Sequence, residues 1–453
     1  MLLKRRKIVV IGGNIAGLTA AASAREVDKH AKIVVLSREL CPPYCRLSLP
    51  SIIVSPTSKV EDFALFTSWI SNLRIHFLSG INALDVDPDE RVVRAENVKT
   101  KERLDFPYDA LVFATGSSAF IPKVEGIEKE GVFGLRTFED ALRISQRAQE
   151  GGDAVVIGAG FVGLKVAEAL AKRRMKVTIA VRSRILRELI EPSFSLHLKN
   201  HIERKGVKVL TGVSPTGIMG GKKVEYVKLN DRKVPASIVV FATGVVPNTD
   251  IARRAGIKLG KTGAIKVNRR MQTSIPEIYA AGDCAEVLDA ITDEWTYFPL
   301  GSVAAKEGAI AGKNAAGTHV DMKGIIRSQM DVIFANEIVS MGHVSETAKE
   351  VGMAVNTMEL STMENRFRFL KLYPSKVMIT INARDQIIGA QIISRRLASV
   401  YVFDLFSAIE KRITLSEFLK GWQPSIPVYT DFLMMRVMSN TGTLLNHTSN
   451  QYC

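Results

Sequence analysis

The sequence predicts an α/β protein with two doubly wound parallel sheets, followed by a smaller α+β domain. A pattern of strand, glycine turn, helix and strand occurs twice, at residues 7–36 and 153–181. Each copy is followed by an apolar strand that ends in Ala-Thr-Gly, at 114–116 and 242–244. From about Met322 the pattern changes to alternating strands, such as Val377–Ile381 and Ile387–Ile393, before a helical run near Val400–Lys411. This mixture is typical of an α+β domain.

The bulk composition sets limits on the class of protein. A chain of 453 residues is too long for a single hydrophobic core, so two or three domains are expected. No run of 18 apolar residues appears, and we expect no membrane span. The basic start Met1–Lys7 does not introduce a signal peptide, because the apolar stretch Ile8–Ile11 runs directly into a glycine turn.

The cysteines and the charge point to a location and to partners. The four cysteines, with the seven histidines, give neither a disulfide framework nor a metal-ligand spacing, so a cytoplasmic location is expected. The net charge of +15 favours anionic partners. A generally basic surface is the simpler interpretation, and a docking face for an acidic protein is the alternative. The sequence has no segment in which aromatic and basic residues alternate, so it does not predict nucleic-acid binding.

The first copy is read as strand Lys7–Ile11, a helix from Ile15 to about Arg25 and strand Lys32–Leu36. A phosphate-binding turn needs a tight backbone, close approach to pyrophosphate and free N–H donors at a helix N-terminus. Asn14 occupies the middle glycine slot, and asparagine tolerates left-handed backbone. The candidate nucleotide-binding residues of this turn are Gly12, Asn14, Ile15, Ala16 and Gly17.

The second copy is read as strand Asp153–Ile157, helix Leu164–Lys172 and strand Lys176–Val181. Its glycine pattern is complete, and the candidate residues are Gly158, Gly160, Phe161, Val162 and Gly163. One glycine fingerprint alone is a weak signal. Because strand, turn, helix and second strand all occur twice, the sequence predicts two dinucleotide-binding domains.

Both copies lack the usual acid at the end of the second strand. In the first, Ser37 takes that slot and Glu39 follows, as a candidate for the adenosine ribose or as an ordinary loop carboxylate. In the second, Val181 takes the slot, before Arg182-Ser183-Arg184. Arginines can pair with a 2′-phosphate that an acid would repel, so NADPH use, or use of both NADPH and NADH, is favoured over a solvated basic loop.

Taken in order, these motifs resemble the pyridine nucleotide-disulfide oxidoreductase family, in particular its NADH oxidase, coenzyme A-disulfide reductase and NAD(P)H-nitrite reductase flavin-domain branches. The resemblance covers almost the whole chain. Its most specific segments are Val245–Asn248, Gly263–Asn268, Gln272–Ser274 and Ile278–Asp283.

The resemblance implies a cofactor, FAD, and residues that hold it. Gly282 and Asp283 match the pair that holds FAD, with the acid on the ribityl or pyrophosphate region; Asp283 can also cap a helix. Pro299 and Leu300 lie in a segment like the family's flavin-ring segment. Further cofactor-binding candidates, at the Ala-Thr-Gly ends, are Thr115, Gly116 and Gly244.

The resemblance also implies a domain plan. Residues 1–118 and 245–321 would form the FAD-binding domain, 119–244 the NAD(P)-binding domain and 322–453 a C-terminal dimerisation domain. A homodimer is therefore expected. The segment Trp422–Tyr429 resembles the family's late interface loop, with Gln423 where the classical disulfide reductases carry an acid–base histidine.

The redox cysteine of this family is missing. Aligned on Pro50, the cysteine position of the oxidase and coenzyme A branches falls on Leu47, and Cys45 stands two residues earlier. The stretch is closer to the Pro-Tyr-x-Arg form of flavin reductases without a redox thiol. In that form Arg46 would lie by the flavin or its phosphates. Lys165 stands where many members have glutamate, and it would touch the flavin edge or the nicotinamide, or be solvated.

Three functions stay open at this point. The first is a flavoenzyme that takes hydride from NAD(P)H and reduces oxygen, a small acceptor or an electron-carrier protein, with Arg46 and Lys165 as catalytic candidates. The second is a disulfide or polysulfide reductase that uses Cys45, with or without Cys41. The third is a flavoprotein scaffold that senses NAD(P)H. The absence of sulfur at Leu47 favours the first over the second, and two intact nucleotide motifs favour it over the third.

Overall fold

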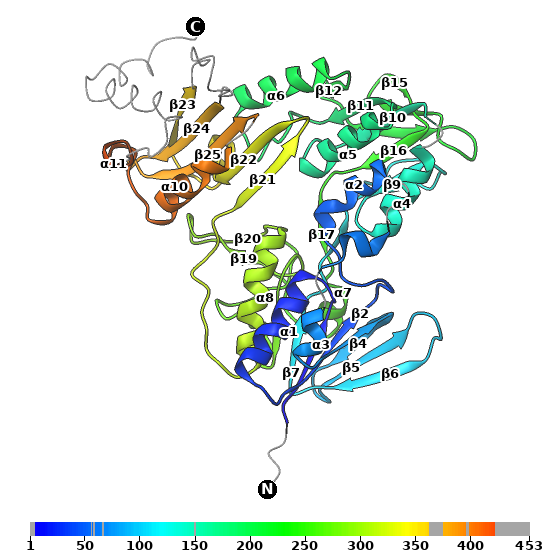
Figure 1. Cartoon of the computed structure of the whole chain (residues 1–453), viewed down its shortest axis with the longest axis vertical. Coiled ribbons are helices and arrows are strands. Elements are labelled where there is room, and N and C mark those ends of the chain that lie inside the picture. Colours follow the sequence, from blue (N-terminus) through cyan, green and yellow to red (C-terminus); the bar gives the residue numbers. More distant parts are fainter. Residues whose placement is uncertain are drawn as a thin grey trace. The chain divides into compact units, whose positions relative to one another are not determined.

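A computed structural model describes residues 5–55, 57, 59–65, 68–148, 151–361, 375–395 and 398–421 (Figure 1). The chain divides into two compact units, one of Met1–Arg182 with Gly206–Ile325 and one of Ser183–Lys205 with Ile326–Cys453. Within the described ranges, no helix combines the length and the hydrophobicity that a membrane crossing requires.

The first unit contains a five-stranded sheet in the order β18-β7-β1-β2-β3, with every neighbouring pair parallel. Its strands are β1 (Lys7–Ile11), β2 (Lys32–Ser37), β3 (Ile75–Ser79), β7 (Ala110–Phe113) and β18 (Ile278–Ala280). The central strands are almost entirely buried apolar residues, as expected of a parallel sheet covered on both faces. Strand β18 joins this sheet from far along the chain.

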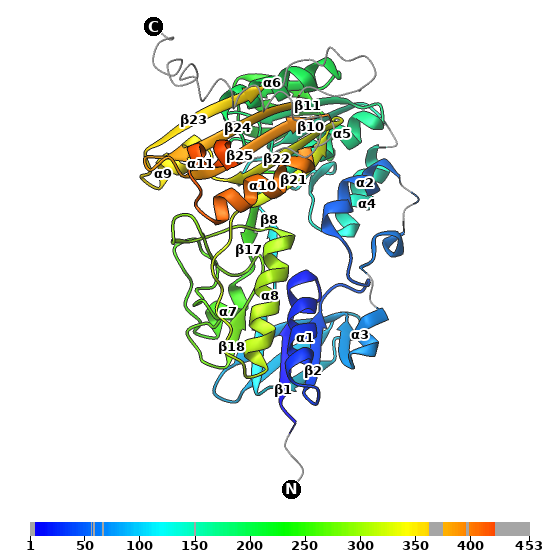
Figure 2. The same ribbon diagram turned by 60° about the vertical axis from the view of Figure 1, so that its left-hand side comes forward.

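Two helices pack closely beside this sheet. Helix α1 (Ile15–Val27) and helix α8 (Gly301–Ala315) lie side by side (Figures 1 and 2). A Cβ atom on Gly308 would lie 2.3 Å from the Ala16 carbonyl oxygen, and one on Gly312 would lie 2.0 Å from that of Ala20. Only glycine, which has no Cβ, allows the backbones of α1 and α8 to approach this closely at both positions.

A second five-stranded parallel sheet lies in the same unit, in the order β12-β11-β10-β16-β9. Its strands are β9 (Val132–Gly134), β10 (Asp153–Ile157), β11 (Lys176–Val181), β12 (Lys208–Thr211) and β16 (Ile238–Phe241). Helix α5 (Phe161–Lys172) begins three residues before the predicted start at Leu164, because Gly160 is the N-cap. Phe161 and Val162 therefore belong to its first turn. Two such sheets confirm the predicted α/β fold class.

Shorter elements complete this unit. The antiparallel pair β8 (Ser117–Ala119) and β17 (Val245–Pro247) lies where the chain passes from one parallel sheet to the other. The remaining strands are β4 (Ile81–Asp87), β5 (Val92–Asn97), β6 (Arg103–Pro107), β13 (Pro215–Met219), β14 (Tyr226–Leu229), β15 (Arg232–Pro235), β19 (Val287–Leu288) and β20 (Trp295–Thr296). The remaining helices are η1 (Arg46–Ser48), α2 (Leu49–Val54), η2 (Val60–Phe63), α3 (Ser68–Asn72), α4 (Phe138–Arg147) and α7 (Asp250–Arg254).

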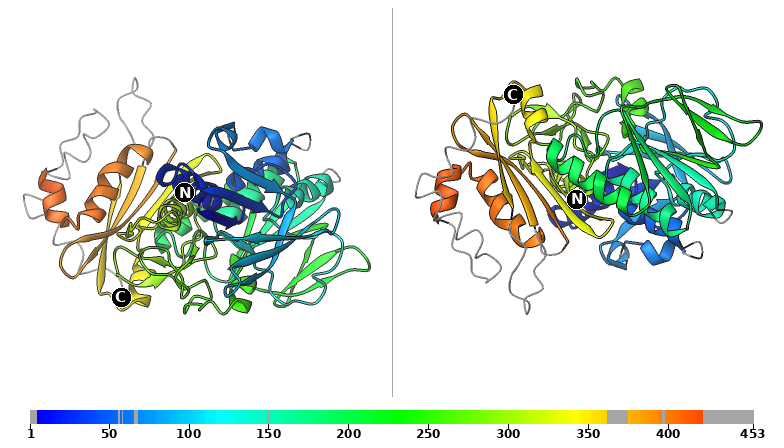
Figure 3. Two further views of the ribbon diagram at one scale, coloured as in Figure 1. Left: turned by 90° about the horizontal axis from the view of Figure 1, so that it is seen from below. Right: turned by 90° about the horizontal axis from the view of Figure 1, so that it is seen from above.

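The second unit is built on an antiparallel sheet in the order β21-β22-β25-β24-β23. Its strands are β21 (Ser328–Ile333), β22 (Asn336–Gly342), β23 (Val355–Ser361), β24 (Ser375–Asn382) and β25 (Ile387–Ser394). Helix α10 (Ala398–Glu410) lies along the sheet (Figure 3). In the chain, α9 (Ser345–Glu350) lies between β22 and β23, and α11 (Leu415–Gly421) follows α10. The late strands and helix match the predicted α+β pattern. Trp422–Tyr429, with Gln423, lies outside the described residues.

The second unit also contains a segment that the sequence analysis assigned to the NAD(P)-binding domain. Residues 183–205, with helix α6 (Pro192–Arg204), group with the C-terminal sheet. The buried Glu191 carboxylate accepts from the backbone N–H and the hydroxyl of Ser345, both at 2.6 Å. The His201 ring nitrogen lies 2.9 Å from the Phe334 carbonyl oxygen. Specific polar contacts therefore attach residues 183–205 to the rest of the second unit. Composition does not reveal such contacts.

Candidate functional site

The turn between β1 and α1 has the tight geometry that a phosphate-binding turn requires. Gly12 has a φ of +123°, and a Cβ there would lie 2.0 Å from the Ala114 carbonyl oxygen. Asn14 is extended, with φ −112° and ψ −161°, and its side chain accepts from the Ile15 N–H at 2.8 Å. The left-handed backbone predicted for Asn14 is therefore wrong: asparagine fits this slot because it caps the helix.

The turn between β10 and α5 repeats this construction. Gly158 has a φ of +108°, and a Cβ there would lie 2.2 Å from the Ala242 carbonyl oxygen. A Cβ on Gly163 would lie 2.3 Å from the Gly158 oxygen, whereas one on Gly160 would meet nothing within 4 Å. The side chain of Val162 is 49% exposed, and Lys165, one turn along α5, is half-buried. The open side at Gly160 suits the approach of a pyrophosphate.

A third segment meets the first turn at the end of β18. Gly282 has a φ of +78°, and a Cβ there would lie 2.8 Å from that of Ala16. A Cβ on Gly301, the first residue of α8, would lie 3.4 Å from Cδ1 of Ile15. Leu300 is the N-cap of α8 and Pro299 before it is exposed. The structure thus brings together residues that the sequence predicted from separate motifs.

Asp283 is held by two side chains that the sequence analysis did not name. Its Oδ2 accepts from Nη2 of Arg136 at 2.5 Å and from the Ser117 hydroxyl at 2.8 Å. Arg136 also donates to the Ser117 carbonyl oxygen at 3.0 Å. The Tyr297 hydroxyl donates to the Asp283 carbonyl oxygen at 2.9 Å. Asp283, with its side chain 13% exposed, is therefore the centre of a polar cluster beside the first turn.

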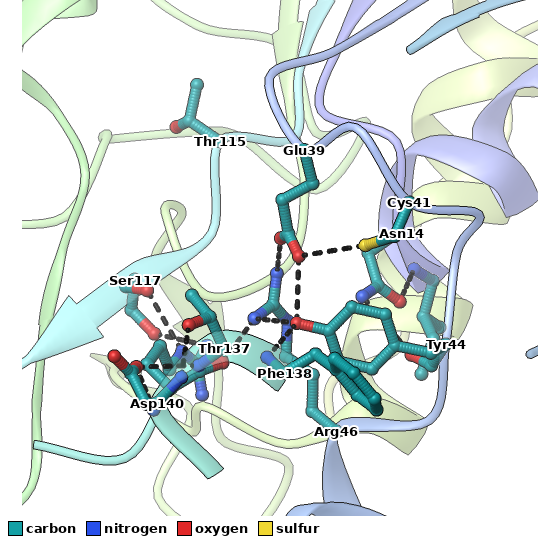
Figure 4. A network of polar contacts seen from close by, with 12 residues as sticks. Asn14, Glu39, Cys41, Tyr44, Arg46, Thr115, Ser117, Thr137, Phe138 and Asp140 are labelled. Carbon is teal, nitrogen blue, oxygen red and sulfur yellow. Dashed lines mark hydrogen bonds and ion pairs between the residues drawn. The ribbon is translucent and has the colours of Figure 1, made fainter. Parts of the chain in front are cut away.

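Arg46 belongs to the same network, drawn in Figure 4. It donates to the Arg136 carbonyl oxygen and forms an ion pair with Glu39 at 2.5 Å. Glu39 also accepts from the Tyr44 hydroxyl at 2.8 Å. The carboxylate that was a candidate for the adenosine ribose thus contacts Arg46 and Tyr44.

The cysteines near this network are free thiols. Cys41 and Cys45 form no disulfide and both are half-buried. Burial, with the negative charges of Glu39 and Glu139 adding to it, raises the pKa of Cys41 to about 11. A thiol with this pKa is protonated at neutral pH and is a poor nucleophile. Leu47, which the sequence analysis aligned with the family's redox thiol, is 78% exposed.

The Ala-Thr-Gly segments lie beside the crossing of the chain between the two sheets. The Thr115 hydroxyl donates to the Asn248 carbonyl oxygen at 2.6 Å, and the Asn248 N–H donates to the Gly116 carbonyl oxygen at 2.9 Å. Gly116 and Gly244 have φ values of +67° and +109°, and a Cβ on either would meet nothing within 4 Å. Both backbones are therefore open on one side.

The two arginines after β11 differ in their surroundings. Arg182 is exposed. Arg184 lies in the second unit, where its Nη2 forms an ion pair with Glu346 at 2.6 Å and its Nη1 donates to the Ile190 carbonyl oxygen at 2.5 Å. Because Arg184 is engaged in this way, the argument for a 2′-phosphate now depends on Arg182 alone.

Glu307 is a buried acid that the sequence analysis overlooked. It is 1% exposed; its Oε2 accepts from the Gly282 N–H at 2.6 Å, and its Oε1 is buried without a partner. Burial raises the pKa of Glu307 well above its ordinary value, and the neighbouring Asp283 adds to this, while the Gly282 N–H opposes it. Burial beside the Gly282–Asp283 turn therefore favours the neutral form of Glu307 over the charged form.

The sequence held signals for some of these residues. Arg136 directly precedes a capping box, in which Thr137 accepts from the Asp140 N–H and Asp140 accepts from the Thr137 N–H. Glu307 is the one acid among the buried residues of α8, which are otherwise small or apolar except for Asn314. Nothing local to Ser117 predicted its contact with Asp283.

The comparisons with known proteins agree on one family. Residues 6–308 match the family model described as pyridine nucleotide-disulphide oxidoreductase. The chain is 32% identical over 422 residues to an NADH oxidase of Methanocaldococcus jannaschii, covering 91% of this chain and 92% of that protein. It is 33% identical over 288 residues to the assimilatory nitrate reductase electron transfer subunit of Bacillus subtilis, covering 63% of this chain and 36% of that protein. Among solved structures it resembles an NAD-dependent persulfide reductase from A. fulgidus, with a TM-score of 0.89, 30% identity and coverage of 96% and 84%.

The Asp283 cluster predicts loss of FAD when the carboxylate is removed. Asp283→Ala should purify with much less FAD, because it removes a polar partner and leaves Arg136 without its ion pair, at a cost of about 1–3 kcal/mol. The ratio of flavin to protein absorbance measures this. Asp293→Asn, an exposed carboxylate paired with Arg269, is the control. Unchanged flavin content in Asp283→Ala would remove this residue from the site.

The buried acid predicts a pH-dependent loss of stability. The folded-state pKa of Glu307 lies above its unfolded value, so its contribution to the free energy of unfolding falls as pH rises from the ordinary glutamate pKa through the raised one. Glu307→Gln keeps the shape without this penalty and should unfold a few degrees higher at neutral pH, roughly 2–4 °C. The difference in Tm should shrink toward pH 4.5. A difference that stays constant between acid and neutral pH would show that Glu307 is ionised in the folded protein.

Proposed function

The chain belongs to the pyridine nucleotide-disulphide oxidoreductase family, and from this premise we propose that it passes electrons from NAD(P)H to an acceptor outside the protein without a redox cysteine. It is an FAD-dependent NAD(P)H oxidoreductase, as its relatives are. When bound, FAD takes hydride from NAD(P)H and supplies the electrons to the acceptor.

The proposed FAD site comprises the first turn and the segments that meet it. The cradle fits this group because its glycines leave no room for a side chain against the backbone. Arg136 and Arg46 supply positive charge and Asp283 a polar acceptor, beside the N-terminus of α1. The proposed FAD-binding residues are Gly12, Asn14, Ile15, Ala16, Gly17, Arg46, Thr115, Gly116, Arg136, Gly282, Asp283, Pro299 and Leu300.

The proposed NAD(P)H site uses the second turn. Its residues are Gly158, Gly160, Phe161, Val162, Gly163, Arg182 and Gly244. The first turn of α5 presents backbone N–H groups and the exposed Val162, which suit a pyrophosphate and the apolar part of the nucleotide. Lys165 is the proposed cation nearest to this turn on the helix.

The observation that carries the proposal is Leu47. The position that the family uses for a redox thiol holds an apolar side chain that is 78% exposed. The neighbouring Cys41 thiol has a pKa of about 11, so it supplies no thiolate at neutral pH. In this proposal the flavin alone carries the electrons, and Cys45 is the free thiol that a thiol-based alternative would use.

For the acceptor, we favour an electron-carrier protein or oxygen. The relative from Bacillus subtilis bears the name of an electron transfer subunit, and the relative from Methanocaldococcus jannaschii that of an oxidase. The net charge of +15 suits an acidic carrier, since opposite charges speed association.

Persulfide or polysulfide reduction is the second candidate. It is favoured by the likeness to the persulfide reductase at 30% identity and by Cys45, a half-buried free thiol two residues before Leu47.

We also propose the assembly, the location and the domain plan. A homodimer through the C-terminal unit is supported by Phe403 of α10, a large apolar side chain that is 83% exposed. Free thiols at Cys41, Cys45 and Cys284 suit a reducing, cytoplasmic location. The proposed domains are residues 1–118 with 245–321, 119–244 and 322–453.

The absent thiol predicts a two-electron enzyme. In an anaerobic titration with NADPH, the wild type and Cys45→Ser should both take up two electrons per FAD, without a long-wavelength charge-transfer band. Leu47→Cys should acquire that band, because it restores sulfur at the family's position, and Leu47→Ala is its control. Four electrons in the wild type, falling to two in Cys45→Ser, would make Cys45 the redox residue and favour the second candidate.

The exposed arginine predicts a preference for NADPH, or parity with NADH. Arg182→Ala should lower kcat/KM for NADPH by roughly three- to tenfold and leave NADH almost unchanged, since an exposed charge contact is weaker than a buried one. Lys176→Ala, at the other end of β11, is the matched control. A strong preference of the wild type for NADH would contradict this proposal.

A further inference from the structure

The carboxylate of Glu39 lies between an arginine, a buried tyrosine and a thiol. Its Oε1 pairs with Nη2 of Arg46 at 2.5 Å. Its Oε2 accepts from the Tyr44 hydroxyl at 2.8 Å and from the Cys41 thiol at 3.8 Å. Figure 4 shows these groups turned toward the carboxylate. Both oxygens are therefore engaged within the segment 39–46.

Tyr44 fixes the position of this carboxylate. It is 1% exposed, its hydroxyl accepts from the Phe138 N–H at 3.0 Å, and the two rings pack edge to face with centroids 6.2 Å apart. Its carbonyl oxygen accepts from Nδ2 of Asn14 at 3.3 Å, which attaches the segment to the first glycine turn. A carboxylate bonded to Tyr44 is thus held at a fixed place beside that turn.

Arg46 is fixed in turn by Glu39. Its guanidinium lies 5.4 Å from the centre of the Tyr44 ring and donates to the Arg136 carbonyl oxygen. The Arg136 side chain binds Asp283 at 2.5 Å, so Arg46 and Asp283 share one partner. A long arginine side chain loses much rotamer entropy when it binds a ligand, and an ion pair that orders it beforehand reduces that loss.

The residue that lies beside the first glycine turn at the end of β2 is Ser37, and not Glu39. A Cβ on Gly13 would lie 2.6 Å from the Cβ of Ser37, so Ser37 flanks the turn at the end of β2. Glu39 lies two residues further, where its carbonyl oxygen accepts from the Gly80 N–H at 3.1 Å. Its side chain is directed toward Arg46.

We propose that Glu39 is a positioning residue that, together with Tyr44, orients Arg46 for the flavin half of FAD, and that it is not the ligand of the adenosine ribose. This inference rests on the proposed function, because it takes Arg46 to be a flavin-side residue. It replaces the earlier candidate role of Glu39 with one that its partners support.

The test separates the two halves of FAD. The full chain is stripped of flavin and titrated with FAD, with FMN, which lacks the adenosine, and with AMP, which lacks the flavin. Glu39→Gln should weaken FMN and FAD binding about ten- to hundredfold, the value of a charge-assisted hydrogen bond, and leave AMP binding unchanged. Glu61→Gln, an exposed carboxylate on η2, is the matched control.

A double-mutant cycle distinguishes positioning from a general structural effect. If Glu39 acts through Arg46, Glu39→Gln in an Arg46→Gln background should cause little further loss of FMN binding, and Tyr44→Phe should shift FMN binding in the same direction as Glu39→Gln. The Tm of the stripped chain, measured over the same cycle, reports the coupling without flavin.

Two outcomes would overturn the inference. Weaker AMP binding in Glu39→Gln with unchanged FMN binding would return Glu39 to the ribose. Additive losses in the cycle would mean that Glu39 does not act through Arg46. Either result, in a wild type that binds FAD and oxidises NAD(P)H, leaves the proposed function standing, whereas a wild type that binds no FAD overturns both.

Discussion

The ion pair between Arg136 and Asp283 holds together segments that lie far apart in the sequence. Asp283 follows β18, the last strand of the first sheet, and Arg136 follows β9, an edge strand of the second. Through its carbonyl oxygen and its guanidinium, Arg136 also meets Arg46 and Ser117. Arg136 is thus the common partner of Asp283 and Arg46, which come from different parts of the chain. The site thus depends on one charged contact surrounded by half-buried side chains, where such contacts are stronger than in bulk water.

The strands and turns could be predicted because their causes are local. The strands Lys7–Ile11, Asp153–Ile157 and Lys176–Val181 have the predicted bounds, since runs of apolar residues flanked by glycine turns specify buried parallel strands. The contacts of the site could not be predicted in the same way. The pairing of Arg136 with Asp283 joins residues on different sheets, and the engagement of Arg184 by Glu346 depends on the fold of the second unit. Asn14 shows a third case, because its extended backbone and its role as helix cap differ from the left-handed backbone that the sequence analysis considered.

Two buried or half-buried carboxylates with opposite tasks lie near the first turn. Glu39 forms an ion pair with Arg46 and so orders that side chain. Glu307 is buried close to Asp283, which raises its pKa, and its Oε2 accepts from the Gly282 N–H, so it links α8 to the turn after β18. Environment, and not residue type, decides these roles. The same principle applies to the cysteines, since burial beside Glu39 makes Cys41 a packing residue and not a nucleophile.

The first sheet is split along the chain, and this has a consequence for how the protein is made. Strand β18 pairs with β7, yet the whole of the second sheet is encoded between them. On the ribosome, all five strands of the second sheet, from β9 to β16, emerge before the edge partner of β7 has been translated. Until then β7 has an unpaired edge, which is a template for wrong pairing. A ribosome that stalls before β18 therefore leaves a nascent chain in which every strand of the second sheet is present and the first sheet still has an open edge.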